Sequence, residues 1–179
     1  MQLQETGFEG LLLLQPNTYK DERGSFTESW NQETFKGMNL NISFVQDNQS
    51  ISHKNVLRGL HFQKEPHAQG KLVRVSYGRA LDVVVDLRKE SETYGKHFKV
   101  ELDGKQGNML WIPAGFAHGF VALENHTVFQ YKCDAPYHPH SEECILWNDP
   151  SIGIHWEVEN PIISPKDLQG KLLSSALAF

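Results

Sequence analysis

The segment GNMLWIPAGFAH, residues 107–118, contains the end of one strand and the start of the next. Its run MLWI is apolar, which is typical of a buried strand, and Pro113 ends that strand because proline cannot donate to a strand ladder. Gly115 permits a tight reversal, since glycine adopts backbone conformations that other residues avoid. We therefore expect His118 to point from the second strand into the interior of the fold.

Further short strands are predicted at a spacing of roughly ten residues, with Gly, Asn or Asp between them. The clearest are LVRVSY (72–77), ALDVVVDLR (80–88), FKVEL (98–102), HGFVAL (118–123) and TVFQYKC (127–133). The pair Asp103-Gly104 is expected to form a hairpin-type turn. Helix signals are confined to SWNQETFKGM (29–38) and a short turn at SPKDLQG (164–170). The pattern predicts an all-β sandwich or barrel, organised as a single domain over residues 1–179.

The composition is that of a globular chain that can bury a core. Its 179 residues are 39% hydrophobic and 22% charged, which is ordinary for a folded domain of this length. The formal net charge is -5, so we do not expect the chain to bind nucleic acid through its overall charge. A local basic pocket that binds a small anion remains compatible with this charge.

Neither a secreted nor a membrane protein is expected. The run LLLL at 11–14 is too short for a signal peptide, and Glu5 and Glu9 stand where basic residues would be needed. No apolar stretch approaches the length that spans a bilayer. Cys133 and Cys144 lack CxxC spacing and are interpreted as free thiols in a reducing compartment. We expect a cytoplasmic protein.

The spacing G-x5-P-x-G-x2-H of residues 107–118 resembles the second signature of the cupin superfamily. That resemblance implies a double-stranded β-helix, or jelly roll, with a few short peripheral helices. Many cupins hold a metal with an HxH pair, a carboxylate and a later histidine. Here His61 and His67 are not so spaced, and the pair in His138-Pro139-His140 lies in a proline-rich loop without a patterned carboxylate. We expect no metal site.

Four side chains are candidates for acid–base chemistry without a metal, and each has a structural alternative. His61 is a candidate base, because imidazole titrates near neutrality. Tyr131 is either a core tyrosine or an acid facing that base. Lys71 is either a surface charge or an inward group that stabilises an oxyanion. Asp167 is either a helix cap or a carboxylate on Nδ1 of a histidine, where it would fix the tautomer and stabilise the imidazolium.

Nine colinear motifs together resemble the dTDP-4-dehydrorhamnose 3,5-epimerase family over nearly the whole chain. They are YKDERGSF (19–26), FVQDNQS (44–50), VLRGLHFQ (56–63), QGKLVRV (69–75), LDVVVDLR (81–88), LWIPAGFAHGF (110–120), FQYKC (129–133), ILWNDPSIGI (145–154) and PIISPKD (161–167). The resemblance implies an isomerase that inverts C3 and C5 of dTDP-4-dehydro-6-deoxy-D-glucose. The product would be dTDP-4-dehydro-L-rhamnose, and no cofactor would be needed.

The resemblance also implies the roles of individual residues. His61 would be the base, Asp167 its partner, Tyr131 the acid that reprotonates from the other face, and Lys71 the group near the charge that develops on O4. Arg23 and Arg58 would meet the diphosphate. Further ligand-binding positions would be Glu28, Gln46, Asp47, Asn48, His118, Tyr137, Glu142 and Lys166.

The match is loosest after Tyr131, where Tyr137 fills an aromatic position but its neighbour is Pro136. In the family this region influences whether one or both carbons are inverted. A monofunctional 3- or 5-epimerase therefore stays open, as does a non-catalytic jelly roll that binds sugar nucleotides. The resemblance further implies a homodimer in which N-terminal strands pack on the partner, and the run LLLL suits either an exchanged strand or a core strand.

Overall fold

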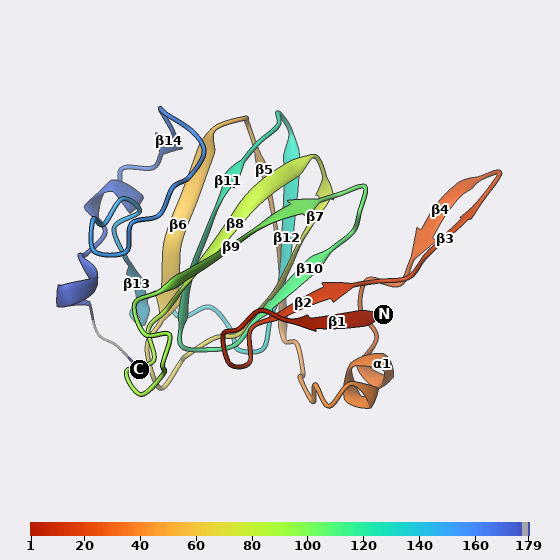
Figure 1. The fold of residues 1–179 in the computed structure, drawn as a ribbon, viewed down its shortest axis with the longest axis horizontal. Helices are drawn as coiled ribbons and strands as arrows, with labels where there is room; N and C mark the ends of the chain where they lie inside the picture. The colour runs from red at the N-terminus through yellow and green to blue at the C-terminus, as the bar shows by residue number, and fades with distance from the viewer. Residues whose placement is uncertain (177–178) are drawn as a thin grey trace.

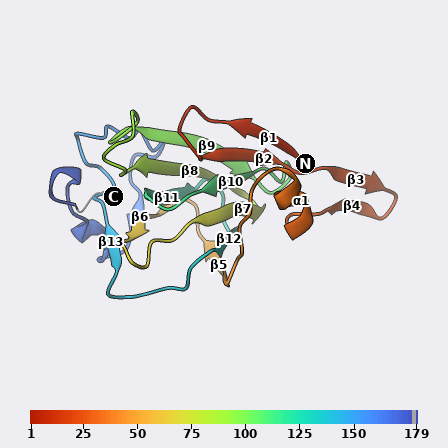
Figure 2. The same cartoon turned by 90° about the horizontal axis from the view of Figure 1, so that it is seen from below.

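The computed structural model describes residues 1–176 and 179, and its body consists of two antiparallel sheets packed face to face (Figures 1 and 2). The first sheet has the order β1 (Gln2–Glu5), β2 (Leu12–Gln15), β10 (Met109–Ile112), β7 (Lys71–Tyr77), β12 (Thr127–Cys133), β5 (Gln46–Ser52). The second has the order β13 (Glu142–Cys144), β6 (Val56–Gln63), β11 (Phe116–Ala122), β8 (Arg79–Asp86), β9 (His97–Asp103), and β14 (Ile162–Ile163) pairs in parallel with β6. The predicted β-sandwich is confirmed as a jelly roll.

Alternating side chains of both sheets fill the space between them. Val73, Val75 and Phe129 of the first sheet pack with Val84 and Phe120 of the second, and all five are buried. The rings of Phe120 and Phe129 stack with their centroids 3.9 Å apart. This is the inward face that period-two alternation predicts for β7 and β12.

A second cluster explains why β8 is apolar on both faces. Val83 and Val85 point away from the first sheet and pack against Ile152 and Trp156 of the C-terminal segment. A strand covered on both sides gains stability from a nearly continuous apolar run, which is what LDVVVD provides. Leu11 and Leu14 of the LLLL run are fully buried in their own chain, where β2 pairs with β1 and β10.

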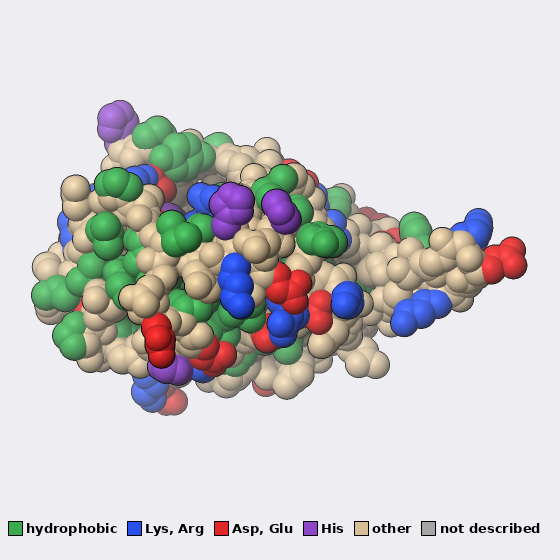
Figure 3. All heavy atoms as spheres, turned by 90° about the horizontal axis from the view of Figure 1, so that it is seen from above, with side chains coloured by type: hydrophobic (Ala, Val, Ile, Leu, Met, Phe, Trp, Pro, Cys, Tyr) green, Lys and Arg blue, Asp and Glu red, His purple; other side chains and the backbone are tan. Residues whose placement is uncertain are grey.

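The remaining elements lie at the periphery. Helix α1 (Gln32–Gly37) is capped by the side chain of the preceding Asn31, and it buries Phe35 against the outer side of the first sheet. Two 3₁₀ turns, η1 (Asp167–Gln169) and η2 (Leu173–Ser175), lie in the C-terminal segment. The hairpin of β3 (Thr18–Asp21) and β4 (Gly24–Thr27) projects from the body, with charged side chains at its tip (Figures 1 and 3). No helix within the described residues is long and apolar enough to cross a bilayer.

The prediction that Asp103-Gly104 forms a hairpin is wrong, although a turn does form there. The turn exists, with the Asp103 carboxylate accepting from the Lys105 amide at 2.7 Å. However, it joins β9 of the second sheet to β10 of the first, and these two strands do not pair. The prediction failed because the turn dipeptide determines a local reversal and not the partner of the strand that follows.

The reversal predicted at Gly115 is confirmed. Its φ is +95°, a conformation that side chains with a Cβ rarely adopt, and a Cβ there would lie 2.6 Å from Cγ of Arg88.

Candidate active site

The two sheets enclose a cleft of about 530 Å³ between the inner faces of β5, β7 and β12 on one side and β6 and β11 on the other. This volume suits a ligand of small-molecule size. The polar and charged residues that line it are Gln49, Ser50, Arg58, His61, Lys71, His118, Tyr131, Glu142, Ser164, Lys166 and Asp167. Eight of these residues were predicted to be functional: Arg58, His61, Lys71, His118, Tyr131, Glu142, Lys166 and Asp167.

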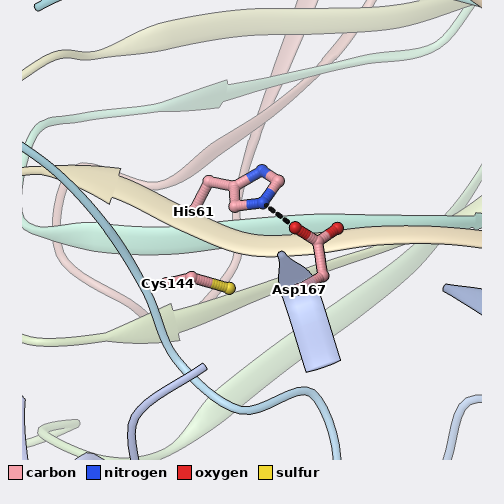
Figure 4. A group of neighbouring side chains, drawn as sticks. All are labelled: His61, Cys144 and Asp167. Carbon is pink, nitrogen blue, oxygen red and sulfur yellow. Dashed lines mark hydrogen bonds and ion pairs between the residues drawn. The ribbon is translucent and has the colours of Figure 1, made fainter. Parts of the chain in front are cut away.

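His61 and Asp167 form a hydrogen-bonded pair at one wall of the cleft (Figure 4). Nε2 of His61 on β6 lies 2.8 Å from Oδ1 of Asp167, the first residue of η1. The other carboxylate oxygen accepts from the Gly59 amide at 3.2 Å, and the Asp167 amide donates to Ser164 Oγ at 3.1 Å. The pairing of a carboxylate with a histidine is confirmed, but it uses Nε2 and not the expected Nδ1. The lone pair of Nδ1 is thereby left free to act as a base.

Asp167 is buried, and its pKa has two opposing influences. Burial raises the pKa of the carboxyl, but hydrogen bonds from His61, Gly59 and Ser164 outweigh burial and hold it below its usual value. The group is therefore an anion at neutral pH. It can orient the ring of His61 and stabilise the imidazolium that forms when the ring takes up a proton.

A second histidine–carboxylate pair stands next to the first. β6 and β11 pair in a register that sets His118 opposite His61, and Gly59 and Gly119 bring the two backbones close together. His118 Nε2 donates to Oδ2 of Asp82 at 2.8 Å, and both residues are buried. Asp82 was not predicted as a site residue, although an acid inside the apolar run LDVVVD was a signal for a buried, paired carboxylate.

The opposite wall carries Lys71 and Tyr131, from the neighbouring strands β7 and β12. Nζ of Lys71 lies 6.0 Å from the centroid of the Tyr131 ring. Lys71 is buried, and burial lowers the pKa of its amine even though the negative charges of Glu142 and Asp82 oppose that shift. Burial likewise raises the pKa of the Tyr131 hydroxyl. Tyr131 is therefore protonated at neutral pH and can donate a proton.

The predicted ligand-binding residues His118, Glu142, Lys166 and Arg58 also line this cleft. Glu142 accepts from Lys166 and, at 2.8 Å, from the hydroxyl of Tyr137. Burial raises the pKa of Glu142, but these two hydrogen bonds outweigh burial and lower it overall. Arg58 Nε donates to Ser52 Oγ at 3.3 Å, which leaves the remaining guanidinium donors available to a ligand.

The predicted run of Gln46, Asp47 and Asn48 is divided between two faces of β5. Gln46 and Asn48 line a small pocket of about 80 Å³ that shares His61, Lys71, Tyr131 and Glu142 with the main cleft. Asp47 points to the outer face of the sheet, where its carboxylate pairs with Lys132 at 2.7 Å. The structure therefore does not bring Asp47 to the cleft, because successive side chains of a strand point to opposite faces.

Arg23 and Glu28 also lie outside the cleft of their own chain. Arg23 is at the turn of the β3–β4 hairpin, where its side chain is 85% exposed and pairs only with Asp21. Glu28 accepts from Asn31 Nδ2 and Thr34 Oγ1, both at 3.1 Å, close to the start of α1. In a single chain neither residue can reach a ligand in the cleft.

Comparison with known proteins adds an independent line of evidence. The family model described as dTDP-4-dehydrorhamnose 3,5-epimerase matches residues 5–175. The dTDP-4-dehydrorhamnose 3,5-epimerase of Salmonella typhimurium is 50% identical over 175 residues, which cover 97% of this chain and 96% of that protein.

Two solved structures have the same fold. One is the dTDP-6-deoxy-D-glucose-3,5-epimerase of Legionella pneumophila in complex with dTDP-4-keto-L-rhamnose, with TM-score 0.93, 43% identity, and coverage of 97% of this chain and 93% of that one. The other is a 3'-monoepimerase of Streptomyces bikiniensis in complex with dTDP-quinovose, with TM-score 0.89, 30% identity, and coverage of 94% and 86%.

Proposed function

The chain belongs to the dTDP-4-dehydrorhamnose 3,5-epimerase family, and we propose that its cleft converts dTDP-4-dehydro-6-deoxy-D-glucose to dTDP-4-dehydro-L-rhamnose by inversion at C3 and C5. The protein is thus an isomerase of dTDP-L-rhamnose biosynthesis with a cupin-type jelly roll. The observation that carries the mechanism is the placement of the His61–Asp167 pair on one wall of the cleft and of Tyr131 and Lys71 on the other.

The substrate dictates what these groups must do. Its C4 ketone acidifies the hydrogens on C3 and C5, so the reaction consists of removing a proton, holding an enolate and returning a proton to the opposite face of the ring. Two proton-transfer groups on opposite sides of the sugar are required, with a positive charge near O4. A ligand held between the two sheets meets both requirements.

His61 is the base in this proposal. Its Nδ1 lone pair abstracts the proton, while Nε2–H stays bonded to Asp167. The anionic Asp167 stabilises the imidazolium as it forms. The Gly59 amide donates to its carboxylate, and Ser164 Oγ accepts from its backbone amide, so the residue is held in place. General base catalysis of this kind contributes about 10²–10⁴-fold to a rate.

Tyr131 returns a proton from the other side, and Lys71 stabilises the enolate oxygen. The buried ammonium group of Lys71 acts in surroundings that exclude water, where a charge placed in advance is most effective. Its lowered pKa also makes the ammonium group a stronger acid, which favours donation of a hydrogen bond or a proton to O4.

The nucleotide end of the ligand is assigned to Arg58 and Lys166, with Gln46, Asn48, Tyr137 and Glu142 around it. Guanidinium groups match phosphate oxygens in geometry as well as charge. We further propose that the chain forms a homodimer in which the β3–β4 hairpin of one copy reaches the cleft of the other. Tyr19 and Phe26 pair across this hairpin and are 63% and 68% exposed, so they offer an apolar surface next to Arg23.

The function is tested with dTDP-4-dehydro-6-deoxyglucose in D₂O, following deuterium at C3 and C5 by NMR. We expect label and inversion at both carbons, and loss of both in His61→Ala. In Tyr131→Phe, we expect exchange to persist at a reduced rate while inversion is lost, because the base is intact and the acid is missing.

Two other outcomes have separate meanings. Label at only one carbon would indicate a monofunctional epimerase, an alternative supported by the likeness to the 3'-monoepimerase and by Pro136 beside Tyr137. Binding without any exchange would contradict the catalytic proposal and leave a sugar-nucleotide-binding jelly roll.

A further inference from the structure

Cys144 lies beside the His61–Asp167 pair, although no step of the proposed reaction uses a thiol. β13 pairs with β6 in a register that sets Cys144 opposite His61. The ligand atoms of His61, Cys144 and Asp167 all lie within 4.8 Å of one another (Figure 4). Across residues 1–176 and 179, this is the one group of three histidine, cysteine or acidic side chains that comes so close together.

We propose that His61, Cys144 and Asp167 form an inhibitory binding site for a thiophilic divalent metal ion such as Zn²⁺. An imidazole nitrogen, a thiolate and a carboxylate oxygen are three ligands that Zn²⁺ accepts, with a water molecule completing a tetrahedron. The thiolate and the carboxylate together neutralise the two positive charges of the ion.

The distances require only small movements. A tetrahedral zinc site with ordinary bond lengths places its ligand atoms about 3.4–3.6 Å apart. The distance between Nε2 of His61 and Oδ1 of Asp167, now 2.8 Å, would therefore increase by less than about 1 Å. Sγ of Cys144, which lies at most 4.8 Å from these two atoms, would move closer to them. Rotation about side-chain torsions is enough for shifts of this size, because Cys144 lies at the sheet edge on the short strand β13.

The surroundings of Cys144 leave its sulfur free to turn toward a metal ion. The Cys144 Sγ has only a weak contact to the Ile145 carbonyl at 3.4 Å, so little is lost when it turns to a metal. Burial raises the pKa of this thiol to about 12, so binding of a metal ion has to displace the thiol proton. A bound metal ion deprotonates a coordinating thiol outright. The Gly59 amide can keep its bond to the second oxygen of Asp167 and so orient the carboxylate for the metal.

Metal binding would remove the base, a consequence that rests on the proposed function. Bonds form from the metal to Nε2, Sγ and a carboxylate oxygen, and the S–H bond breaks with release of its proton to solvent. The Nε2 proton is displaced and the ring becomes protonated on Nδ1, so one proton is released in total. The Nδ1 lone pair that would abstract the substrate proton is then occupied.

Binding is tested directly by titrating the metal-free protein with Cd²⁺ and recording the ultraviolet charge-transfer band of a cadmium–thiolate bond. We expect one equivalent to produce the band, Cys144→Ala to abolish it, and Cys133→Ala, the matched control at the other cysteine, to retain it. Calorimetry with Zn²⁺ in buffers of different ionisation enthalpy should show release of one proton. Cys144→Ala should weaken zinc binding by at least about 10–100-fold, since even loss of an outer partner has an effect of that size.

Inhibition is tested separately by epimerase assays in the presence of Zn²⁺. We expect inhibition that a chelator reverses and that Cys144→Ala and Cys144→Ser relieve, whereas Cys133→Ala does not. A missing thiolate band, or a band that is unchanged in Cys144→Ala, would overturn the metal site. A normal band with zinc-insensitive activity would overturn the inhibitory role alone, and a normal band on an inactive chain would count against the proposed function instead.

Discussion

At the scale of single residues, the cleft contains two histidine–carboxylate pairs with the same hydrogen-bond length and different surroundings. The side chain of His61 is 28% exposed, whereas that of His118 is 8% exposed and bonded to a fully buried Asp82. A proton-transfer group must reach its substrate, so we propose His61 rather than His118 as the base. His118 is better suited to a fixed hydrogen bond or to holding Asp82, whose Oδ1 is buried without a partner among the described residues.

Lys71 illustrates a residue whose position opposes stability. Its amine is buried, and burial lowers its pKa because the charged form is poorly solvated. We expect Lys71→Met to reduce kcat by about 10²–10³-fold through loss of enolate stabilisation. The same change should raise the free energy of unfolding by at least about 1 kcal/mol, or Tm by about 2–4 °C.

This prediction is checked by kinetics and thermal unfolding on the same preparations. The control is Lys105→Met, which removes a lysine at an exposed turn and should leave both quantities nearly unchanged. A Lys71→Met protein with normal activity and unaltered Tm would contradict two claims: that this amine stabilises the enolate, and that its burial destabilises the fold.

At the scale of elements, the site depends on how closely β6 and β11 approach. A Cβ on Gly119 would lie 2.7 Å from the Arg58 carbonyl and 3.0 Å from Cα of Gly59. These neighbours are backbone atoms of a paired strand and cannot move independently. The close approach therefore holds His61 and His118 side by side, and it connects the packing of two strands to the geometry of the cleft.

We expect Gly119→Ala to destabilise the fold by about 1–3 kcal/mol, the usual effect of overpacking, and to lower activity with it. Gly37→Ala is the matched control, because a Cβ on this residue of α1 meets nothing within 4 Å. It should be neutral or slightly stabilising. Denaturant unfolding of both variants measures the difference, and equal stabilities would show that the strands can separate without cost.

At the scale of the whole molecule, the projecting hairpin is the feature that a single chain does not explain. If the hairpin of one copy completes the cleft of another, Arg23→Ala and His61→Ala chains should each be poorly active alone but complement each other when mixed. In a mixed dimer, one cleft would combine a normal His61 with Arg23 from the partner. Random exchange of subunits would then restore up to about a quarter of full activity.

The measurement is a denaturation–renaturation of the two variants together, with sedimentation to establish the dimer. His61→Ala mixed with Asp167→Asn is the control, since both changes fall in the same cleft and no mixed dimer has an intact one. Absence of complementation in a proven dimer would place Arg23 outside the partner's site.

Acid stability is another property of the whole fold, and Asp86 at the end of β8 contributes to it. Its carboxylate is buried and accepts from Arg88, Ser91 and Thr93. Burial raises its pKa, but these bonds outweigh burial and lower the pKa from 3.8 to about 2. The anion thus stabilises the fold above the unfolded pKa of about 3.9, and this contribution is lost as the pH falls toward 2.

The lowered pKa corresponds to about 2 kcal/mol of pH-dependent stability. We expect the difference in free energy of unfolding between the unaltered chain and Asp86→Asn to be constant from pH 7 to about 5 and to shrink below about pH 4. Denaturant unfolding across this range measures it. A difference that does not change with pH would mean that the carboxylate has the same pKa in both states.

The sequence by itself determined the strands β7 to β12, the inward faces of β7 and β12, the reversal at Gly115 and the chemical types of the acid–base groups. These properties follow from local periodicity and from the conformational limits of proline and glycine, which act within a few residues. The family resemblance pointed to cleft-lining residues on three strands. Lys71 and Tyr131 lie on β7 and β12, which the pattern located, whereas Arg58 and His61 lie on β6, which it did not.

The tertiary structure alone decided which distant segments meet. Asp167 approaches His61 across 106 residues of chain and bonds to Nε2, and Cys144 joins them only because β13 pairs with β6. The tertiary structure likewise decided which strand pairs with β10 after Asp103-Gly104. It also placed Asp47 on the outer face of its sheet and Arg23 away from the cleft of its own chain. Strand pairing is set by the summed burial of both sheets, a non-local quantity that no short stretch of sequence contains.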